Sequence, residues 1–344
     1  MLEVDIRKSY RGFRLDVKFE AEGRHALMGA SGSGKSLTLK AIAGVMTPDE
    51  GVIALDGRVL FDSARGVNLP PRARGVGLMF QHYALFPTMT AAENIACGLR
   101  AKRPPDAAER VSQLIEKLHL TGLEALYPPQ LSSGQQQRVA LARILASEPG
   151  LILLDEPFSA LDSHLRWQME REVAEALEEF DGASILVTHD FGEAYRLCGS
   201  LSVMDGGSVR ASGDKRALYD HPGALAAARM TGCRNISIAE KTGPNRLRAV
   251  EWGIELTCAR PVPENVRYVG VRADAIREAA QGETGTFEWR IVAGAEAPED
   301  GVLEVSLGGA PLRWEMPRDA FFRRRDLGRG VLAIPPECVY PLTD

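Results

Sequence analysis

Apolar runs in the first two thirds of the chain alternate with segments of helical spacing. Residues 14–20 read RLDVKFE, an alternation of apolar and charged positions that is typical of a half-buried strand, and 26–28 is a short apolar run. Residues 35–43 have the spacing of a helix. The apolar runs 151–154 and 184–187 predict strands buried on both faces of a parallel sheet. Strands that alternate with helices in this way predict an α/β domain.

The middle of the chain predicts a helical region. Residues 51–80 have a β-rich pattern with Gly and Pro turns. From about residue 88 to 147 the apolar spacing is helical, and two proline pairs interrupt it. Residues 163–180 form a charged, amphipathic pattern that predicts a further helix. We therefore expect a helical subdomain at about 88–147 within the α/β domain.

The pattern changes near residue 231, where short alternating strands replace the helical spacing. Apolar and polar residues alternate at 303–307 and again at 312–316. The glycine pair at 308–309 predicts a two-residue hairpin turn between them, because such turns need positive φ angles. We predict two domains, residues 1–230 and residues 231–344, the second a small β-rich barrel or sandwich.

The composition is that of an ordinary globular protein and excludes several other classes of protein. Of 344 residues, 45% are hydrophobic and 25% charged, which excludes disorder, collagen-like repeats and a membrane-embedded body. No apolar stretch approaches 18 residues, and the first residues lack the apolar core of a signal peptide. The net charge of −5 argues against nucleic acid as a partner, since binding it relies on many Lys and Arg contacts to phosphate.

Neither the cysteines nor the single basic run is taken to indicate a functional site. The five cysteines are odd in number, far apart and without a C-x-x-C pair, so reduced thiols are favoured over a metal site or disulfides. The single basic run, 323–325, is interpreted as a solvated face beside Asp326 rather than as an oxyanion or nucleic-acid patch.

The strongest chemical signal is a phosphate-binding loop. Residues 29–36 fit G-x-x-x-x-G-K-[ST] between a predicted strand and a predicted helix, the context that this motif requires. The glycines let successive N–H groups point at phosphate, and the helix start adds the positive end of its dipole. Lys35 is expected to reach the β- and γ-phosphates, and Ser36 to bind Mg²⁺. The candidate residues are Gly29, Ala30, Ser31, Gly32, Ser33, Gly34, Lys35 and Ser36.

An acidic pair follows the predicted strand at 151–154. Asp155 and Glu156 lie where this strand ends, and the carboxyl ends of parallel strands are where open α/β sheets bind ligands. Taken alone, the pair could simply open the next helix. Together with the phosphate-binding loop it predicts Asp155 as a Mg²⁺ residue and Glu156 as the group that polarises an attacking water.

These residues belong to a longer series that resembles the ATP-binding-cassette (ABC) family. The segment 131–135, LSSGQ, resembles the LSGGQ signature and comes shortly before the 151–154 strand, as in the family. Gln81 resembles the Q-loop, the segment 159–162 the D-loop, and the segment 188–190, THD, the switch histidine. The resemblance covers about residues 1–230. Ser133 replaces the consensus glycine, from which we expect reduced backbone freedom but no loss of function.

The resemblance implies a P-loop NTPase (RecA-like) cassette with a helical subdomain, followed by a small all-β domain with an oligonucleotide-binding-like (TOBE/MOP-type) fold. It implies ATP hydrolysis with Mg²⁺ in a head-to-tail dimer, in which the signature of one subunit closes on nucleotide held by the other. Tyr10 is a candidate for stacking on adenine, with Phe13 or simple packing as alternatives. The remaining implied residues are Glu156, His189 and Gln81 for catalysis, Ser36, Gln81 and Asp155 for metal, and Ser132, Ser133, Gly134, Gln135 and Asp162 for nucleotide.

A single cassette with a β-rich extension resembles the ATPase subunits of binding-protein-dependent importers. Residues 56–71 look most like molybdate-importer ATPases, with sulfate and other oxyanion importers next. The resemblance implies membrane permease subunits as partners, a solute-binding protein as an indirect partner, and a peripheral location on the cytoplasmic face of the inner membrane. Two alternatives stay open here, a soluble cassette ATPase that acts outside transport and a storage or regulatory protein whose β-domain binds the oxyanion. Whether that domain binds oxyanion or only dimerises also stays open.

Overall fold

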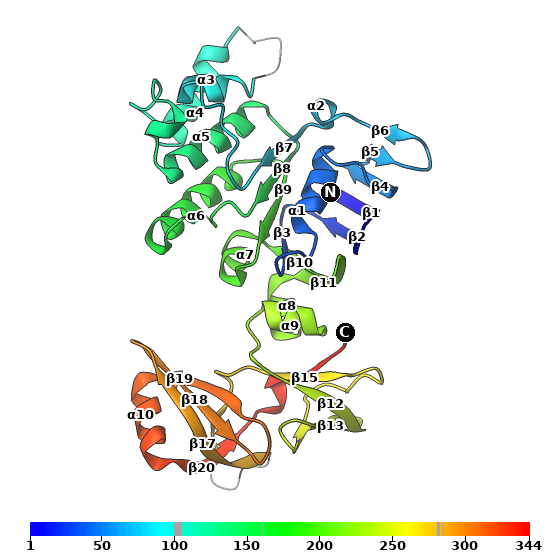
Figure 1. Ribbon diagram of the computed structural model, residues 1–344, viewed down its shortest axis with the longest axis vertical. Coiled ribbons are helices and arrows are strands. Elements are labelled where there is room, and N and C mark those ends of the chain that lie inside the picture. Colours follow the sequence, from blue (N-terminus) through cyan, green and yellow to red (C-terminus); the bar gives the residue numbers. More distant parts are fainter. Residues whose placement is uncertain (100–104, 160, 281–282, 284) are drawn as a thin grey trace. The chain divides into compact units, whose positions relative to one another are not determined.

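The computed structural model describes residues 1–99, 105–159, 161–280, 283 and 285–344. The chain divides into two compact units, Met1–Lys215 and Arg216–Asp344 (Figure 1). Each is described by itself below.

The first unit is built on a large mixed sheet. Its strand order in the described residues is β6-β5-β4-β1-β2-β11-β10-β3-β9-β8-β7. The neighbours β10, β3, β9, β8 and β7 all run parallel. The strands are β1 (Leu2–Tyr10), β2 (Phe13–Ala21), β3 (Arg24–Gly29), β4 (Glu50–Leu55), β5 (Arg58–Asp62), β6 (Val67–Asn68), β7 (Val76–Met79), β8 (Leu151–Asp155), β9 (Ala183–Thr188), β10 (Ser200–Asp205) and β11 (Ser208–Asp214).

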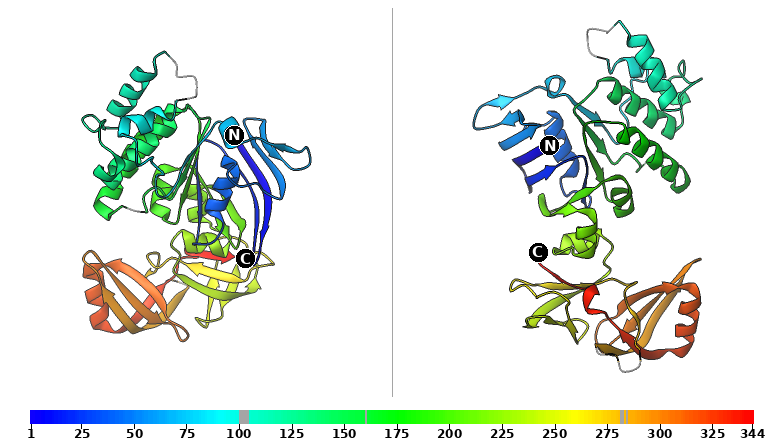
Figure 2. Two further views of the ribbon diagram at one scale, coloured as in Figure 1. Left: turned by 45° about the horizontal axis from the view of Figure 1, so that its top comes forward. Right: turned by 180° about the vertical axis from the view of Figure 1, so that it is seen from behind.

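Helices pack on this sheet and form a group of their own at about 88–147. Every residue of β8 is buried, as its unbroken apolar run predicted. Helices α3, α4 and α5 lie together in both views of Figure 2, so the predicted helical subdomain is confirmed. The helices are α1 (Lys35–Ala43), α2 (Pro71–Arg74), α3 (Ala91–Ala96), α4 (Ala107–Lys117), α5 (Ser133–Ala146), α6 (Ser163–Glu178) and α7 (Phe191–Leu197).

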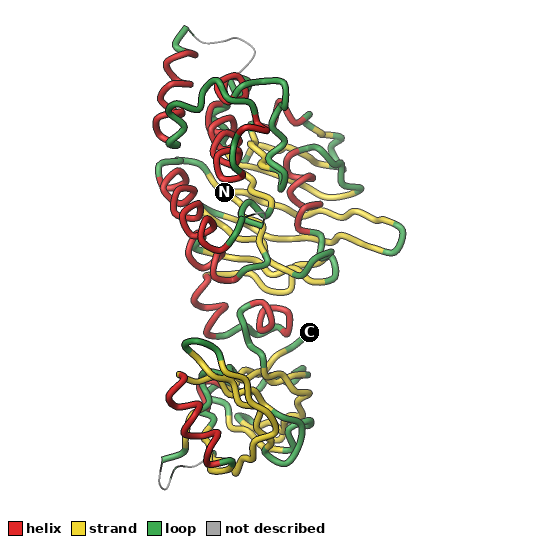
Figure 3. The backbone as a smooth tube through the Cα atoms, turned by 60° about the vertical axis from the view of Figure 1, so that its left-hand side comes forward, coloured by secondary structure: helices red, strands yellow, loops and turns green. Residues whose placement is uncertain are grey.

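The second unit consists mainly of strands (Figure 3). Two five-stranded sheets, β14-β13-β12-β15-β21 and β16-β20-β17-β18-β19, enclose a core in which Trp289 and Trp314 meet edge to face at 5.7 Å. The strands are β12 (Asn235–Gly243), β13 (Arg246–Ala249), β14 (Ile254–Thr257), β15 (Tyr268–Val271), β16 (Arg277–Glu278), β17 (Thr286–Glu296), β18 (Asp300–Ser306), β19 (Leu312–Pro317), β20 (Arg329–Ala333) and β21 (Val339–Leu342).

Helices α8 (Lys215–Asp220) and α9 (Leu225–Met230) precede these strands. The boundary between the two compact units, at 215/216, lies fifteen residues before the predicted boundary at 230/231. The reason lies in packing at the far end of the chain. Leu225 N–H donates to the Thr343 carbonyl at 2.8 Å, and Ala228 packs in a small core with Leu342. The β-rich unit therefore includes both helices.

A further helix, α10 (Arg318–Leu327), covers one side of the second sheet and was not predicted. It contains the basic run. Arg323 and Arg325 are exposed, as expected, but Arg324 is folded back, 3.1 Å from a Glu278 carboxylate oxygen and over the Trp314 ring at 4.9 Å. The run is thus only partly the solvated face that the sequence indicated.

The β18–β19 hairpin is present, but its predicted two-residue turn is wrong. The last paired residues are Val305 and Leu312, so the loop is longer. The Ala310 N–H donates to the Glu251 carbonyl at 2.7 Å, and a Cβ at Gly309 would lie 2.3 Å from that same oxygen. The loop is held against distant backbone, which a local glycine pair does not reveal.

Candidate functional site

The phosphate-binding loop is a tight turn that connects β3 to α1. The Lys35 ammonium donates to the Gly29 and Ala30 carbonyls at 2.8 and 3.0 Å. Gly29 has φ +152°, and a Cβ there would lie 2.3 Å from the Met204 carbonyl oxygen. At Gly34, with φ +104°, a Cβ would lie 2.6 Å from the Leu15 side chain. Side chains are therefore excluded at both ends of the loop by backbone conformation and by space.

The loop leaves donors free for an anion. Within the described residues, the N–H groups of Ser31, Gly32 and Gly34 form no hydrogen bond, whereas Ser33 N–H donates to the Ala30 carbonyl. The Ser33 hydroxyl is buried without a partner among the described residues. Free N–H groups beside the start of a helix form a phosphate site.

Ser36 and Asp155 meet at the base of this loop. The Ser36 hydroxyl donates to a carboxylate oxygen of Asp155 at 2.9 Å. Burial raises the pKa of Asp155, and the Ser36 hydrogen bond opposes that shift. Burial also lowers the pKa of Lys35, against the influence of the Glu156 and Asp155 carboxylates. A hydroxyl and a carboxylate are ligands that suit Mg²⁺, which completes its shell with waters and substrate phosphate.

Glu156 and His189 face each other at the ends of two adjacent parallel strands, β8 and β9. The His189 Nδ1 lies 3.6 Å from a Glu156 carboxylate oxygen, and the histidine side chain is 62% exposed against 22% for the glutamate. Glu156 has φ +46°, a conformation that non-glycine residues rarely adopt, and its N–H donates to the Val187 carbonyl at 3.0 Å. Strain held in this way is typical of functional sites.

Ser159, a residue without an assigned role, connects the predicted Q-loop to the main chain of Glu156. The Gln81 amide donates to the Ser159 hydroxyl at 3.4 Å, and that hydroxyl donates to the Glu156 carbonyl at 2.9 Å. Asp162 is the N-cap of α6, without a side-chain capping bond. Ala160, between them in the D-loop, lies outside the described residues.

Glu193 was not predicted from the sequence, and Thr188 was predicted only as part of the 188–190 segment, without a role of its own. The Thr188 hydroxyl donates to the buried Glu193 carboxylate at 2.5 Å and accepts from Asp190 N–H at 3.0 Å, while Asp190 caps α7. Burial raises the pKa of Glu193. These bonds fix the backbone on both sides of His189. An Asp followed by Glu three residues later is a helix-start pattern, and it could have revealed the arrangement.

The signature segment is the start of α5. Ser132 is its N-cap and forms a capping box with Gln135, with hydrogen bonds of 2.8 and 3.3 Å. Ser133 does not have a positive φ, so a serine is accommodated here without backbone strain. The smaller backbone freedom of serine, compared with glycine, therefore does not disfavour this conformation. Among the described residues, no hydrogen bond joins Ser132, Ser133, Gly134 or Gln135 to the phosphate-binding loop.

Tyr10 and Phe13 flank the turn between β1 and β2, with ring centroids 6.5 Å apart. Phe13 is half-buried, and its ring edge lies 3.2 Å from the position of a Cβ at Gly34. Tyr10 is 41% exposed. Phe13 therefore supports the loop, and Tyr10 has the freer ring face.

Comparisons with known proteins agree on one family. The family model described as "ABC transporter" matches residues 13–159. The chain is 38% identical over 288 residues to the sulfate/thiosulfate import ATP-binding protein CysA 2 of Chromobacterium violaceum, covering 83% of this chain and 74% of that protein.

Two other relatives are similar over a shorter part. The molybdenum import ATP-binding protein ModC of Paramagnetospirillum magneticum is 41% identical, over 65% of this chain and 62% of the relative. A putative 2-aminoethylphosphonate import ATP-binding protein, PhnT, of Salmonella typhimurium is 44% identical, over 63% and 58%. The match thus spans about three fifths of the length of these two relatives.

A solved structure supports the fold. The dimeric ATP-binding cassette MJ0796 with bound ADP and Pi aligns with a TM-score of 0.54 and 28% identity, covering 63% of this chain and 99% of that one.

Proposed function

The chain belongs to the ABC transporter ATP-binding proteins, and on this basis we propose that it hydrolyses ATP as the energising subunit of an importer. One observation carries the proposal. The phosphate-binding loop, His189, Glu156 and Gln81 follow β3, β9, β8 and β7, four neighbouring parallel strands whose carboxyl ends share one edge of the sheet.

Each residue has a role that its position supports. Lys35 and the free loop N–H groups bind the β- and γ-phosphates. Ser36 and Asp155, with Gln81, hold Mg²⁺, which neutralises phosphate charge when bound. Glu156 orients and polarises the attacking water, and His189 donates a hydrogen bond to the γ-phosphate. Tyr10 stacks on adenine.

We also propose that two copies form head-to-tail composite sites. The start of α5 is a second anion-binding helix terminus, and its residues have no hydrogen bond to the loop of their own chain. Ser132, Ser133, Gly134, Gln135 and Asp162 would then complete the site of the partner. The relative MJ0796 is a dimer with bound nucleotide products, which supports this arrangement.

The transport partners follow from the same family. None of the described helices is long and apolar enough to cross a membrane. We propose that separate permease subunits bind this chain on the cytoplasmic face of the inner membrane, with a solute-binding protein as an indirect partner. Molybdate is the proposed solute, and sulfate or another small solute is the alternative, because the relatives are named for different solutes.

ATP hydrolysis by the purified full chain tests the proposal. The wild type should turn over ATP in Mg²⁺, and Lys35→Ala should lose ATP affinity as well as rate. Lys18→Ala is the matched control, since its side chain is 79% exposed on β2. Equal loss in both variants, or turnover unaffected by Lys35→Ala, would contradict the site. In cells without the chain, molybdate uptake should fall while sulfate uptake persists, and the reverse would identify sulfate.

A further inference from the structure

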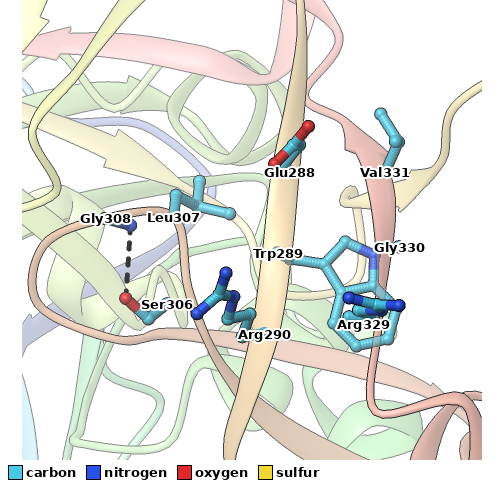
Figure 4. A pocket seen from close by; sticks show the side chains of 9 residues that line it. All are labelled: Glu288, Trp289, Arg290, Ser306, Leu307, Gly308, Arg329, Gly330 and Val331. Carbon is cyan, nitrogen blue, oxygen red and sulfur yellow. Dashed lines mark hydrogen bonds between the residues drawn. The ribbon is translucent and has the colours of Figure 1, made fainter.

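The second unit has a polar groove of its own, between β17, β20 and the loop after β18 (Figure 4). Its volume is about 670 Å³. That is the size of an ordinary small-molecule site and far exceeds a bare tetrahedral anion, which is comparable to a few waters of about 30 Å³ each. The groove is lined by Glu288, Trp289, Arg290, Ser306, Leu307, Gly308, Arg329, Gly330 and Val331.

Two arginines occupy paired positions on adjacent strands of this groove. Arg290 on β17 is directly opposite Arg329 on β20, and Ser306 on β18 is opposite Arg290 from the other side. Residues in such positions have Cβ atoms about 5 Å apart, and like charges there are destabilising. Neither guanidinium has a hydrogen bond or ion pair among the described residues.

Some arginines of the same unit have carboxylate partners. Arg318 lies 2.5 Å from a Glu296 carboxylate oxygen, and Arg324 lies 3.1 Å from Glu278. The opposed pair is therefore a concentration of positive charge that the described part of the chain does not neutralise. Two arginines in paired positions on one face of a sheet suit a dianion with several oxygens, because each guanidinium group can bind two of them at once.

The rest of the groove is not suited to a bare anion. Glu288 lies two residues along β17 from Arg290, about 7 Å away on the same face, opposite Val331. Val331 is 47% exposed. A carboxylate and an apolar surface beside two arginines fit a ligand with a carbon body and a donor at its other end.

We propose that this groove binds a small organic phosphate or phosphonate that also carries an amine or hydroxyl group. Arg290 and Arg329 bind the dianion, Glu288 accepts a hydrogen bond from the amine or hydroxyl, and Leu307 and Val331 cover the carbon chain. Binding relieves the repulsion between the two arginines. The site lies within the β-rich unit and does not depend on ATP hydrolysis.

Calorimetry of the full chain tests the proposal with defined probes. 2-Aminoethylphosphonate should bind more tightly than ethylphosphonate, and more tightly than phosphate, sulfate or molybdate. The double variant Arg290→Gln/Arg329→Gln should weaken it by about tenfold or more, the expected loss of charge-assisted hydrogen bonds. Glu288→Gln should abolish the preference over ethylphosphonate.

Controls separate binding from folding. Arg313→Gln removes an exposed arginine that is opposite Glu304 and outside the groove, and it should leave binding unchanged. The thermal midpoint of the double variant should equal or exceed that of the wild type, because the like-charge pair is gone. Absence of binding by both phosphonates, inorganic anions that bind as tightly as 2-aminoethylphosphonate, or equal losses in Arg313→Gln would each overturn the proposal.

Discussion

Replacement of Gly134 by Asp should prevent ATP-driven closure of the proposed dimer. Gly134 is buried in the first turn of α5, and a Cβ there would lie 3.3 Å from the Met169 Sδ atom. Gly134 does not have a left-handed φ, and the methionine is flexible, so a small shift accommodates the added atom. Gly134→Ala makes the same contact without the charge and is therefore the matched control.

The expected magnitude follows from charge repulsion. If two copies form the proposed composite site, a carboxylate at the start of α5 would lie close to the γ-phosphate held by the partner's loop. Two unit charges about 5 Å apart interact with about 3 kcal/mol at an effective dielectric constant of about 20, which is more than a hundredfold in the closure equilibrium. Gly134→Ala should change closure by less than about tenfold, because it adds only one tight contact.

Light scattering of ATP-bound mixtures provides the assay. Gly134→Asp alone could form only a dimer with two damaged sites, so it should stay monomeric. When a Gly134→Asp subunit is mixed with a Lys35→Ala subunit, both substitutions lie in the same composite site. The other site keeps an intact phosphate-binding loop and an intact signature. The mixture should therefore still close at that one site. Identical behaviour of the mixture and of Gly134→Asp alone would show that the sites are not composite. Equal defects in Gly134→Ala and Gly134→Asp would show that charge repulsion is not the cause.

Three further predictions concern other parts of the molecule. A chain shortened to end at Lys215 should fold and bind ATP, whereas one that ends at Arg229 retains α8 and α9 without their packing partners and should bind more of a dye for exposed apolar surface. Burial lowers the pKa of His25 from 6.5 to about 4, so the unfolded state takes up a proton first on acidification. Between those pH values the free energy of unfolding should fall by about 3 kcal/mol more than in His25→Gln, measured with denaturant. Tyr10→Ala should weaken ATP binding by about 1 kcal/mol or more in calorimetry while Tyr10→Phe does not, and an unchanged affinity in Tyr10→Ala would point to Phe13 or to packing alone.

The parts predicted best from the sequence are those set by local spacing. The loop at 29–36 needs glycines at fixed positions because Gly29 and Gly34 have positive φ and no room for a Cβ. The convergence of Glu156 and His189 could be anticipated because each follows a strand with an unbroken apolar run, the pattern of a parallel sheet. Patterns of this kind act over a few residues and survive in the sequence.

The features that escaped prediction depend on contacts between distant segments. Ser159 connects Gln81 to Glu156 only because the β7 and β8 strands are neighbours. Helix α9 belongs to the β-rich unit because Leu225 bonds to Thr343, over a hundred residues later. Neither set of hydrogen bonds produces a periodic pattern in the sequence. The connection from Gln81 to Glu156 and the boundary between the two units are therefore visible only in the folded chain.

If Glu156 positions the water that attacks ATP, as proposed, turnover by Glu156→Gln measures this role directly. The substitution keeps the size and the hydrogen-bonding backbone of the residue, so ATP affinity should be preserved. Steady-state hydrolysis should fall about 10²- to 10⁴-fold, the usual contribution of a positioned catalytic carboxylate, and ATP should trap the dimer. Turnover near the wild-type rate with ATP bound would show that Glu156 does not have this role.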